Sequence, residues 1–492
     1  GVARRRLGGG QCGRAEGVGA RRRRRVAIVT TLLSFVVVIG VLILIHELGH
    51  FFAARWTGVG VERFSIGFGP VLFRWKGKET EYCLSAIPMG GYVKMMGAEE
   101  SPLEGGGGAL PYDPAKSFAL KPLWARFFIV FAGPGMNFVL AIVIFALVAM
   151  FIGRPVLPSV LGRVQEGGPA AQSGLMSGDR VIAVDGAPVA YWDELIQAVQ
   201  AGGGETIQVT VRREPTGKPE AGREAVERKV ALTPTFTSVR VPPFGDEATI
   251  WGIGVDPYVV PRVGEVMPGS PAAAAGLMAG DIVLAIDGRP VYSPGELTAP
   301  IQKSPGKRVE ISVERDGKPL PIGVIPGLVK EKTSTGQEIE IGRIGISVVT
   351  RAVSYVRSNP VAAVGRGAVQ TWEMTELTAM GLWKLITRQL PASMIGGPIQ
   401  IATEAGRQAK EGPTSLAFFT AVISVNLALL NLLPVPMLDG GHLLFFVIEA
   451  ILGRPLSLKM REIAQQVGFV LLVLLMVLAV YNDLARTDLL KF

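Results

Sequence analysis

Residues 26 to 52 read VAIVTTLLSFVVVIGVLILIHELGHFF, and the rest of the chain is best understood from this stretch. Its first part, Val26 to Ile45, carries no charge and is about 20 residues long, which is enough for a helix to cross the core of a bilayer. The uncharged part ends in His46-Glu47-Leu48-Gly49-His50. The stretch therefore predicts a transmembrane helix that carries an HExxH motif at one end.

The HExxH motif predicts a metal site. Positions i and i+4 share one face of a helix, so His46 and His50 can hold one metal ion together. Glu47 lies beside them, where it can act on a metal-bound water. The motif alone occurs by chance, but His and Glu are costly inside a membrane and need a functional reason there. We therefore favour a metal site over a pair of buried structural histidines.

The composition indicates an integral membrane protein with substantial soluble parts. The chain has 492 residues, of which 49% are hydrophobic, and its mean hydropathy is +0.37. The net charge is +9, with much of the excess in the first 25 residues. That basic run lacks aromatic residues and a folded context, so we predict no nucleic-acid partner. Cys12 and Cys83 lie far apart, and they suggest neither a disulfide framework nor a cysteine zinc site.

The N-terminal segment, residues 1–25, is rich in Gly and Arg and shows no apolar periodicity, so we expect it to be disordered. The first methionine is Met89. We therefore favour a native start near Val26. A cleaved signal peptide is not expected, because the apolar run is too long, contains the HExxH pair and lacks a clear small-residue cleavage site.

Three further uncharged runs predict three more transmembrane helices. They lie at residues 127–152, within residues 413–452, and at residues 463–482. The second run is interrupted by Gly133 to Gly135 and by Asn137. Broken helix is tolerated at membrane depth mainly where protein buries it or where it lines a cavity, so this end should pack near the metal helix.

Residues 53–126 form a polar-to-mixed loop in which we predict a β-hairpin. Thr80 to Met96 contains two strand-like runs joined around Pro88 to Gly91. An edge strand of this hairpin could pair with an extended peptide chain. The simpler interpretation is an ordinary hairpin.

Residues 153–350 contain an internal repeat. Gly168 to Val189 matches Ser270 to Val291, and each copy has a Gly-Leu-Met-x-Gly-Asp turn, a buried strand, an Asp-Gly turn and a helix. The spacing between copies equals one small domain. We place the two domains at 153–240 and 241–350. The following segment, 351–412, is predicted to be helical and amphipathic, and either a membrane-surface helix or an ordinary soluble helix pair fits it.

The predicted topology brings a third metal ligand to the histidines. Four crossings put Asp439, at the end of the third span, on the same side of the membrane as the HExxH motif. Pro434, Pro436 and the glycines after Asp439 would break the helix and turn the carboxylate toward the metal. Glu62 is the competing third ligand and ranks second, because it lies in a polar loop outside the span.

Other polar residues near these motifs have two interpretations each. The amide of Asn431 could bind an extended substrate backbone, or it could join two helices. His442 could support a ligand from outside the coordination shell, but a solvated histidine fits better. Loops on the metal side are rich in basic residues, which predicts that this side is cytoplasmic: Arg55, Arg63, Arg74, Lys76, Lys78, Arg454, Lys459 and Arg461.

The chain resembles the site-2 protease family of intramembrane zinc metalloproteases, and most of all the bacterial regulator-of-sigma-E protease type with two tandem PDZ domains. The matching motifs span the chain after Val26 in the family's order. They are HELGH (His46–His50), GFGP (Gly67–Pro70), IPMGGYVKM (Ile87–Met95), AGPGMNF (Ala132–Phe138), both GLMxGD turns, GGPI (Gly396–Ile399) and NLLPVPMLDGG (Asn431–Gly441).

The resemblance implies a multi-pass α-helical membrane protein with four transmembrane helices and two inserted PDZ-like, mainly-β domains. It implies one zinc ion bound by His46, His50 and Asp439, with Glu47 catalytic and Asn431 positioning the substrate. It also implies a membrane-associated hairpin, and cleavage of membrane-anchored anti-sigma factors and of signal-peptide remnants. The expected location is the bacterial inner membrane, with periplasmic PDZ domains and the active site toward the cytoplasm.

Two other functions are compatible with parts of the sequence. One is a membrane-anchored PDZ scaffold whose zinc is structural, although such a site has no use for Glu47. The other is a soluble-type zinc peptidase tethered to the membrane, which would use Glu62 as the third ligand.

Overall fold

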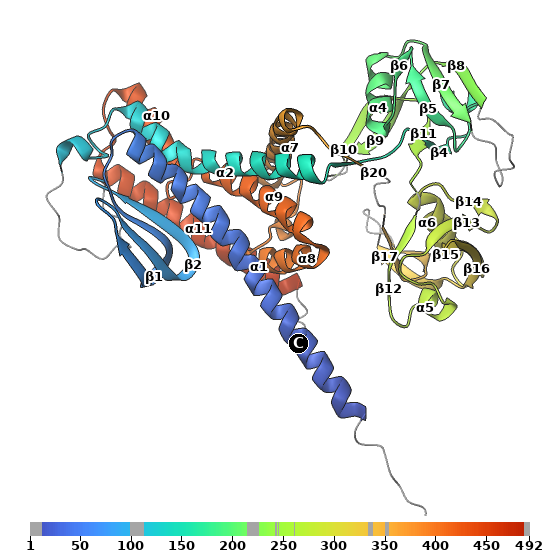
Figure 1. The fold of residues 1–492 in the computed structure, drawn as a ribbon, viewed down its shortest axis with the longest axis horizontal. Coiled ribbons are helices and arrows are strands. Elements are labelled where there is room, and N and C mark those ends of the chain that lie inside the picture. Colours follow the sequence, from blue (N-terminus) through green and yellow to red (C-terminus); the bar gives the residue numbers. More distant parts are fainter. Residues whose placement is uncertain are drawn as a thin grey trace, which may run out of the picture. The chain divides into compact units, whose positions relative to one another are not determined.

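The computed structural model describes residues 12–98, 113–213, 226–241, 244, 246–259, 261–332, 338–349 and 354–486. The chain divides into two compact units, and Figure 1 shows the helices of the first and the strand-rich second. The first unit combines Gly1–Ile152 with Arg357–Phe492, and the second is Gly153–Val356. The second unit is therefore an insertion between two halves of the first.

Four helices of the first unit are long and apolar enough to cross a membrane, as predicted. They are α1 (Cys12–Trp56), α2 (Leu123–Phe151), α9 (Pro413–Asn431) and α11 (Leu458–Arg486). Only 11% of the most apolar window of α11 is buried in the protein, so its apolar side chains face outward, as a lipid-facing helix requires. The structure confirms the multi-pass helical fold class.

Three features of the helices differ from the predictions. Helix α1 begins at Cys12, so the expected disorder is wrong for residues 12–25, where Arg and Ala favour helix; residues 1–11 lie outside the described residues. Helix α2 runs unbroken through Gly135, with Pro134 inside it. The third span ends at Asn431, where a turn begins that leads to α10 (Asp439–Leu452), because Pro434 and Pro436 cannot continue a helix.

Helix α2 is the centre of this unit and packs against α1, α9, α10 and α7 (Pro360–Ile386). Small residues allow the close approach. A Cβ on Gly49 of α1 would overlap the backbone carbonyl of Ala132 in α2, and a Cβ on Gly367 of α7 would crowd the same helix at Ala146. Close backbone contact through glycines is typical of helices packed in membranes.

Two shorter elements join the last helix to the bundle. Helix α8 (Pro398–Glu411) packs against α1, and the short helix η2 (Ala392–Met394) precedes it. The carboxylate of Asp483, in α11, accepts the backbone N–H groups of Gly397, Ile399 and Gln400 at the start of α8. A carboxylate in this position satisfies helix N–H groups that have no partner within the helix.

Strands β1 (Val61–Lys76) and β2 (Glu81–Met95) pair antiparallel in the first unit, and η1 (Pro114–Lys116) follows them. Residues 61–66 pair with residues 91–95 on one side and with residues 81–84 on the other. The two runs predicted to pair with each other thus flank the start of β1 instead. Both strands bend, with Gly67, Gly69 and Gly90 at positive φ, and this lets one pair of strands form four adjacent segments.

The second unit contains two modules, one for each copy of the repeat. Its ends meet where β3 (Arg154–Val156) pairs with β20 (Ser354–Val356). The first module comprises β4 (Leu161–Val164), α3 (Pro169–Gln172), β5 (Arg180–Val184), β6 (Ala187–Pro188), α4 (Trp192–Ala201), β7 (Ile207–Arg213), β8 (Val226–Leu232), β9 (Thr235–Val241), β10 (Asp246–Gly252) and β11 (Val255–Pro257).

The second module repeats this order of elements. It comprises β12 (Arg262–Val266), α5 (Pro271–Ala275), β13 (Ile282–Ile286), β14 (Arg289–Pro290), α6 (Pro294–Gln302), β15 (Val309–Arg315), β16 (Lys318–Val324), β17 (Gly327–Lys332), β18 (Glu338–Arg343) and β19 (Ile346–Val349). The two modules even share backbone detail, because Asp185 and Asp287 take the same left-handed conformation, with φ of 48° and 47°.

The boundary between the modules lies later than predicted. Strand β11 pairs with β4, and Ile253 belongs to the first core together with Leu161 and Leu195. The boundary at residue 240 therefore cuts the first module before its last strand. In the sequence, the hairpin β9–β10 lies between β8 and β11. The last strand of the first module therefore comes after the predicted boundary.

Helix α7 exposes several large apolar side chains, among them Val361, Trp372 and Ile386. The amphipathic character predicted for residues 351–412 and the placement of this helix at a membrane surface stay predictions.

Candidate metal centre

The two histidines of the HExxH motif lie one turn apart on α1 and face the same way. Their Nε2 atoms are 3.2 Å apart. The Nδ1 atom of His50 lies 2.9 Å from the backbone carbonyl oxygen of Ile129, in α2. A carbonyl oxygen only accepts hydrogen bonds, so Nδ1 of His50 donates, and its Nε2 is left free to bind a cation.

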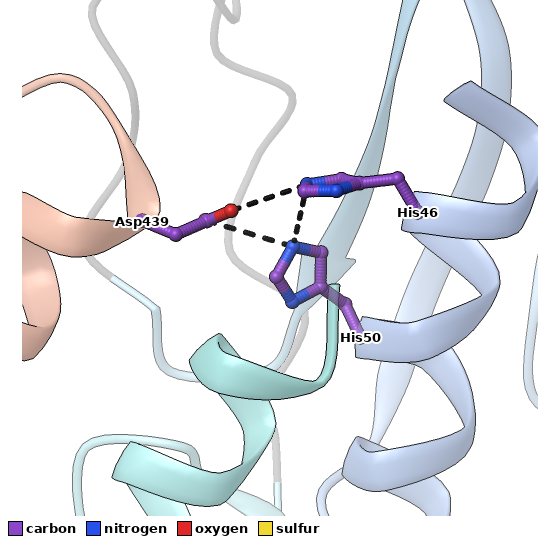
Figure 2. A group of neighbouring side chains, drawn as sticks. All are labelled: His46, His50 and Asp439. Atoms are coloured by element: carbon purple, nitrogen blue, oxygen red, sulfur yellow. Dashed lines mark hydrogen bonds and ion pairs between the residues drawn. The ribbon is translucent and has the colours of Figure 1, made fainter. Parts of the chain in front are cut away.

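Helix α10 contributes the third group, Asp439, from the opposite end of the sequence. Figure 2 shows its carboxylate converging with the two imidazole rings. Its Oδ2 lies 3.1 Å from Nε2 of His46, and its Oδ1 lies 3.6 Å from Nε2 of His50. A Cβ on Gly440 or Gly441 would overlap the backbone of the preceding turn. The two glycines therefore let the turn fold against the start of α10 and aim Asp439 at α1.

The three donor groups fit a zinc ion in both chemistry and spacing. Two imidazoles and one carboxylate form a ligand set used by catalytic zinc sites, which keep a fourth position open. Donors around a tetrahedral zinc stand about 3.3 Å apart, because zinc bonds to nitrogen and oxygen are about 2.0 to 2.2 Å long. The separation of 3.2 Å between the two Nε2 atoms lies close to that edge length, and one oxygen of the Asp439 carboxylate faces each imidazole, at 3.1 and 3.6 Å.

Gly133 of α2 keeps the space next to these donors open. A Cβ built on Gly133 would overlap the Nε2 atoms of both His46 and His50. The site thus requires a residue without a side chain at this point of α2. The Gly-Pro-Gly segment, predicted to pack near the metal helix, does so through this glycine.

Glu47 lies beside the β1–β2 sheet. It follows His46 directly on α1, and a Cβ added to Gly91 of β2 would lie 2.9 Å from its Cγ. The sheet segment that contains Gly91 therefore runs beside the Glu47 side chain. A carboxylate next to a zinc site can accept a proton from water and pass it on.

The other residues proposed from the sequence are not part of this cluster. Among the described residues, the group with metal-ligand spacing is His46, His50 and Asp439. Glu62 instead forms an ion pair with Lys94, at 3.1 Å. Asn431 is the last residue of α9 and is half-buried, and His442 is exposed beside Phe445.

Sequence reasoning did not identify two contacts that support the site. The side-chain amide of Asn137 lies 3.3 Å from Nδ1 of His46. Arg126, near the start of α2, donates two hydrogen bonds to the carboxylate of Glu449 in α10, at 2.6 and 3.2 Å, and packs over the ring of Phe446. Asn137 was visible as a polar residue in an apolar run, but its partner depends on how α2 is rotated.

Basic residues gather near the HExxH end of α1. Arg55 and Lys116 both contact the carboxylate of Glu79. The hydrogen bond from Lys116, helped by the charge of Arg55, holds the pKa of the Glu79 carboxyl below its ordinary value. This carboxylate is exposed, so the ion pairs orient a loop more than they stabilise the fold.

Comparison with known proteins identifies the family. A sequence model of Peptidase family M50 matches residues 34–475. The regulator of sigma-E protease RseP of Escherichia coli is 37% identical over 465 residues, covering 92% of this chain and 98% of that protein. Protease RseP of Yersinia pestis is 36% identical over 469 residues, covering 94% of this chain and 100% of that protein.

A protein of Ralstonia nicotianae that is named as a zinc metalloprotease is 37% identical over 468 residues, covering 93% of this chain and 98% of that protein. These relatives match nearly their whole length, including the membrane unit and the inserted modules. They do not favour the scaffold interpretation. The chain belongs to Peptidase family M50, and it is an intramembrane zinc metalloprotease of the inner membrane.

Proposed function

We propose that His46, His50 and Asp439 bind one zinc ion per chain and that Glu47 is the general base for hydrolysis of peptide bonds within transmembrane segments. The observation that carries this proposal is the spacing of the three donor groups, 3.1 to 3.6 Å. Bound zinc supplies a Lewis acid that polarises the peptide carbonyl and acidifies water.

The protein groups have distinct tasks in this reaction. Glu47 accepts a proton from the attacking water and delivers it to the nitrogen of the leaving amine. His50 is fixed by its bond to the Ile129 carbonyl, so its ring does not need to reorganise during the reaction. Asn431, at the end of α9, hydrogen-bonds the extended backbone of the substrate.

The β1–β2 sheet presents the substrate next to Glu47. Residues 91–95 form an outer segment of this sheet, since their described strand partner is β1 alone. Gly91 in this segment lies against Glu47. An unwound transmembrane segment that pairs with this edge would run past the base with its peptide bonds exposed.

The substrates are membrane-anchored proteins of the anti-sigma-factor type, with signal-peptide remnants as a second class. The relative named “Regulator of sigma-E protease RseP” supports this assignment. The basic residues near the HExxH end of α1 support a cytoplasmic active site. The second unit would then be periplasmic, where its two PDZ-like modules bind ligands or exclude bulky substrates.

Cleavage of a single-span test substrate by the purified protein in detergent tests the proposal, with bound zinc measured in parallel. Glu47→Gln should keep zinc and lose about 10²- to 10⁴-fold in cleavage rate, because it removes only the base. Asp439→Ala should lose both zinc and cleavage. Glu62→Ala is the matched control, because it removes the competing carboxylate, and it should behave as wild type.

Two results would contradict the proposal. Zinc retained by Asp439→Ala but lost by Glu62→Ala would assign the third ligand to the loop. Undiminished cleavage by Glu47→Gln would remove Glu47 from the chemistry.

A further inference from the structure

Asn137 is the most deeply buried polar side chain beside the metal donors. It lies on α2 and is 0% exposed. Its amide is 3.3 Å from Nδ1 of His46, while its Oδ1 has no hydrogen-bond partner among the described residues. A buried amide is costly unless it is hydrogen-bonded. Its only described side-chain partner is a metal-binding imidazole.

The chemistry of the imidazole decides which amide atom faces His46. A neutral imidazole binds a cation through the nitrogen that carries no hydrogen, and the other nitrogen is then a donor. In His46 the nitrogen that faces His50 and Asp439 is Nε2, so Nδ1 must carry the hydrogen. The oxygen and nitrogen of an amide can exchange places without moving the side chain. Only the amide oxygen can accept from Nδ1.

We propose that Asn137 is a positioning residue for zinc, whose Oδ1 accepts the Nδ1–H of His46 and thereby fixes the tautomer and rotation of that ring. This inference rests on the proposed zinc site. The same arrangement gives Oδ1 a hydrogen bond, and the amide nitrogen then takes the position that has no partner among the described residues. Partners of this kind outside the coordination shell raise the basicity of a ligand and hold it in place.

The two histidines are supported in different ways. His50 relies on the backbone carbonyl of Ile129, which no side-chain substitution removes. His46 relies on a side chain. Asn137 therefore offers the way to weaken the support of one ligand while both ligands and their helix stay intact.

The structural role of Asn137 can be separated from its proposed role beside His46. Its backbone carbonyl accepts a hydrogen bond from the hydroxyl of Ser424, in α9, at 2.8 Å. Ser424 is also 0% exposed. Ser424→Ala removes this link between α2 and α9 and leaves the Asn137 amide beside His46. It is the matched control for packing.

Zinc affinity measured by competition with a chromophoric chelator tests the proposal on the full chain, stripped of metal in detergent. Asn137→Leu has a similar size but cannot accept a hydrogen bond, and it should weaken zinc binding about 10- to 100-fold. Asn137→Asp keeps an acceptor facing Nδ1 and should restore the affinity to within a few-fold of wild type. Ser424→Ala should bind as wild type does.

Asn137→Leu with wild-type zinc affinity would overturn the inference, as would an equal loss in Asn137→Asp or in Ser424→Ala. Should Asn137→Leu not fold, Asn137→Ala removes the amide without adding apolar bulk, and the same criteria apply to it. His46→Ala distinguishes failure of the proposed zinc site from failure of the proposed role of Asn137. If it binds zinc as tightly as wild type, the zinc site itself is wrong, whatever the Asn137 variants do.

Discussion

Asp179 and Asp281 of the inserted modules are buried, Asp439 of the first unit is half-buried, and their partners differ. In the inserted modules, Asp179 and Asp281 each receive two hydrogen bonds from one guanidinium, of Arg213 and Arg315 respectively, at 2.6 to 2.7 Å. Each also accepts one backbone N–H. The carboxylate of Asp439 faces two imidazoles and no cationic side chain among its described contacts.

The difference separates a structural carboxylate from one that we propose binds a metal. A carboxylate with a bidentate guanidinium and a backbone donor has its charge paired and most of its acceptor positions used. It can hold a turn in place, and both copies of the repeat contain it. Asp439 and the two imidazoles are three electron-pair donors that face one another, an arrangement that a cation would stabilise. Asp179 and Asp281 thus serve the fold, as Asp483 does at the start of α8, whereas we propose that Asp439 serves the chemistry.

The largest expected effect comes from closing the space beside the donors. Gly133→Ala places a methyl group against the Nε2 atoms of His46 and His50. We expect zinc affinity and cleavage to fall by more than about 100-fold, comparable with losing a supporting residue of a metal site. The backbone should tolerate the change, because alanine favours helix more than glycine does.

Gly135→Ala is the control for that change. It lies two residues further along α2, and its added Cβ would meet only ring carbons of Phe131, at ordinary contact distances of 3.5 and 3.8 Å. Zinc affinity and cleavage should match those of wild type. Equal losses in both variants would show that α2 tolerates no substitution in this segment, and the specific role of Gly133 would fail.

The next largest effect concerns the structural carboxylate of Asp179. Arg213→Met leaves the carboxylate of Asp179, which is 1% exposed, without its guanidinium. An uncompensated buried charge costs about 3 to 5 kcal/mol, so the first module should lose roughly this much stability. Protection of its amides from hydrogen exchange, measured in the full chain, reports the loss.

The neighbouring arginine on β7 provides the control. Arg212 pairs with Glu227, and their side chains are 48% and 55% exposed. Arg212→Met should change the same protection by less than about 1 kcal/mol, as is usual for exposed ion pairs. A similar effect of both substitutions would mean that the burial of Asp179 does not set its energetic role.

Much of the candidate site could be predicted from the sequence, because it depends on local spacing and on span order. His46 and His50 share a helix face at any rotation of that helix. Asp439 could be placed beside them because the number of crossings fixes its side of the membrane, and the Pro and Gly residues around it mark a helix break. The bond between Asn137 and His46 was out of reach, since it depends on the rotation of α2 against α1.

The errors in the predicted fold also come from contacts between segments that are distant in the sequence. Residues 61–66 pair on both sides, and strand pairing between distant segments leaves little trace in local alternation. The domain boundary at residue 240 failed because β11 returns to the first module after the hairpin β9–β10. In each case a non-local contact outweighed the local pattern.

The smallest expected effect is the pH dependence of the stability that the Asp281–Arg315 pair gives the second module. The guanidinium of Arg315 holds the pKa of the Asp281 carboxyl below its ordinary value. A carboxyl whose pKa is lower in the folded state stabilises that state above its unfolded pKa, and this contribution is lost as the pH falls through the folded pKa. The unfolded pKa of aspartate is about 3.9, so the contribution should be complete near neutral pH and should decline below about pH 4.

Comparison with Asp281→Asn isolates this contribution from the other carboxylates, which titrate in both proteins. The gap in stability of the second module, read from exchange protection in β13, should be constant between about pH 5 and 7 and should narrow below about pH 4. A gap that widens on acidification would mean that the buried carboxyl is protonated in the folded state. Asp281 would then resemble a carboxylate that lacks a cation, and the distinction from Asp439 would no longer hold.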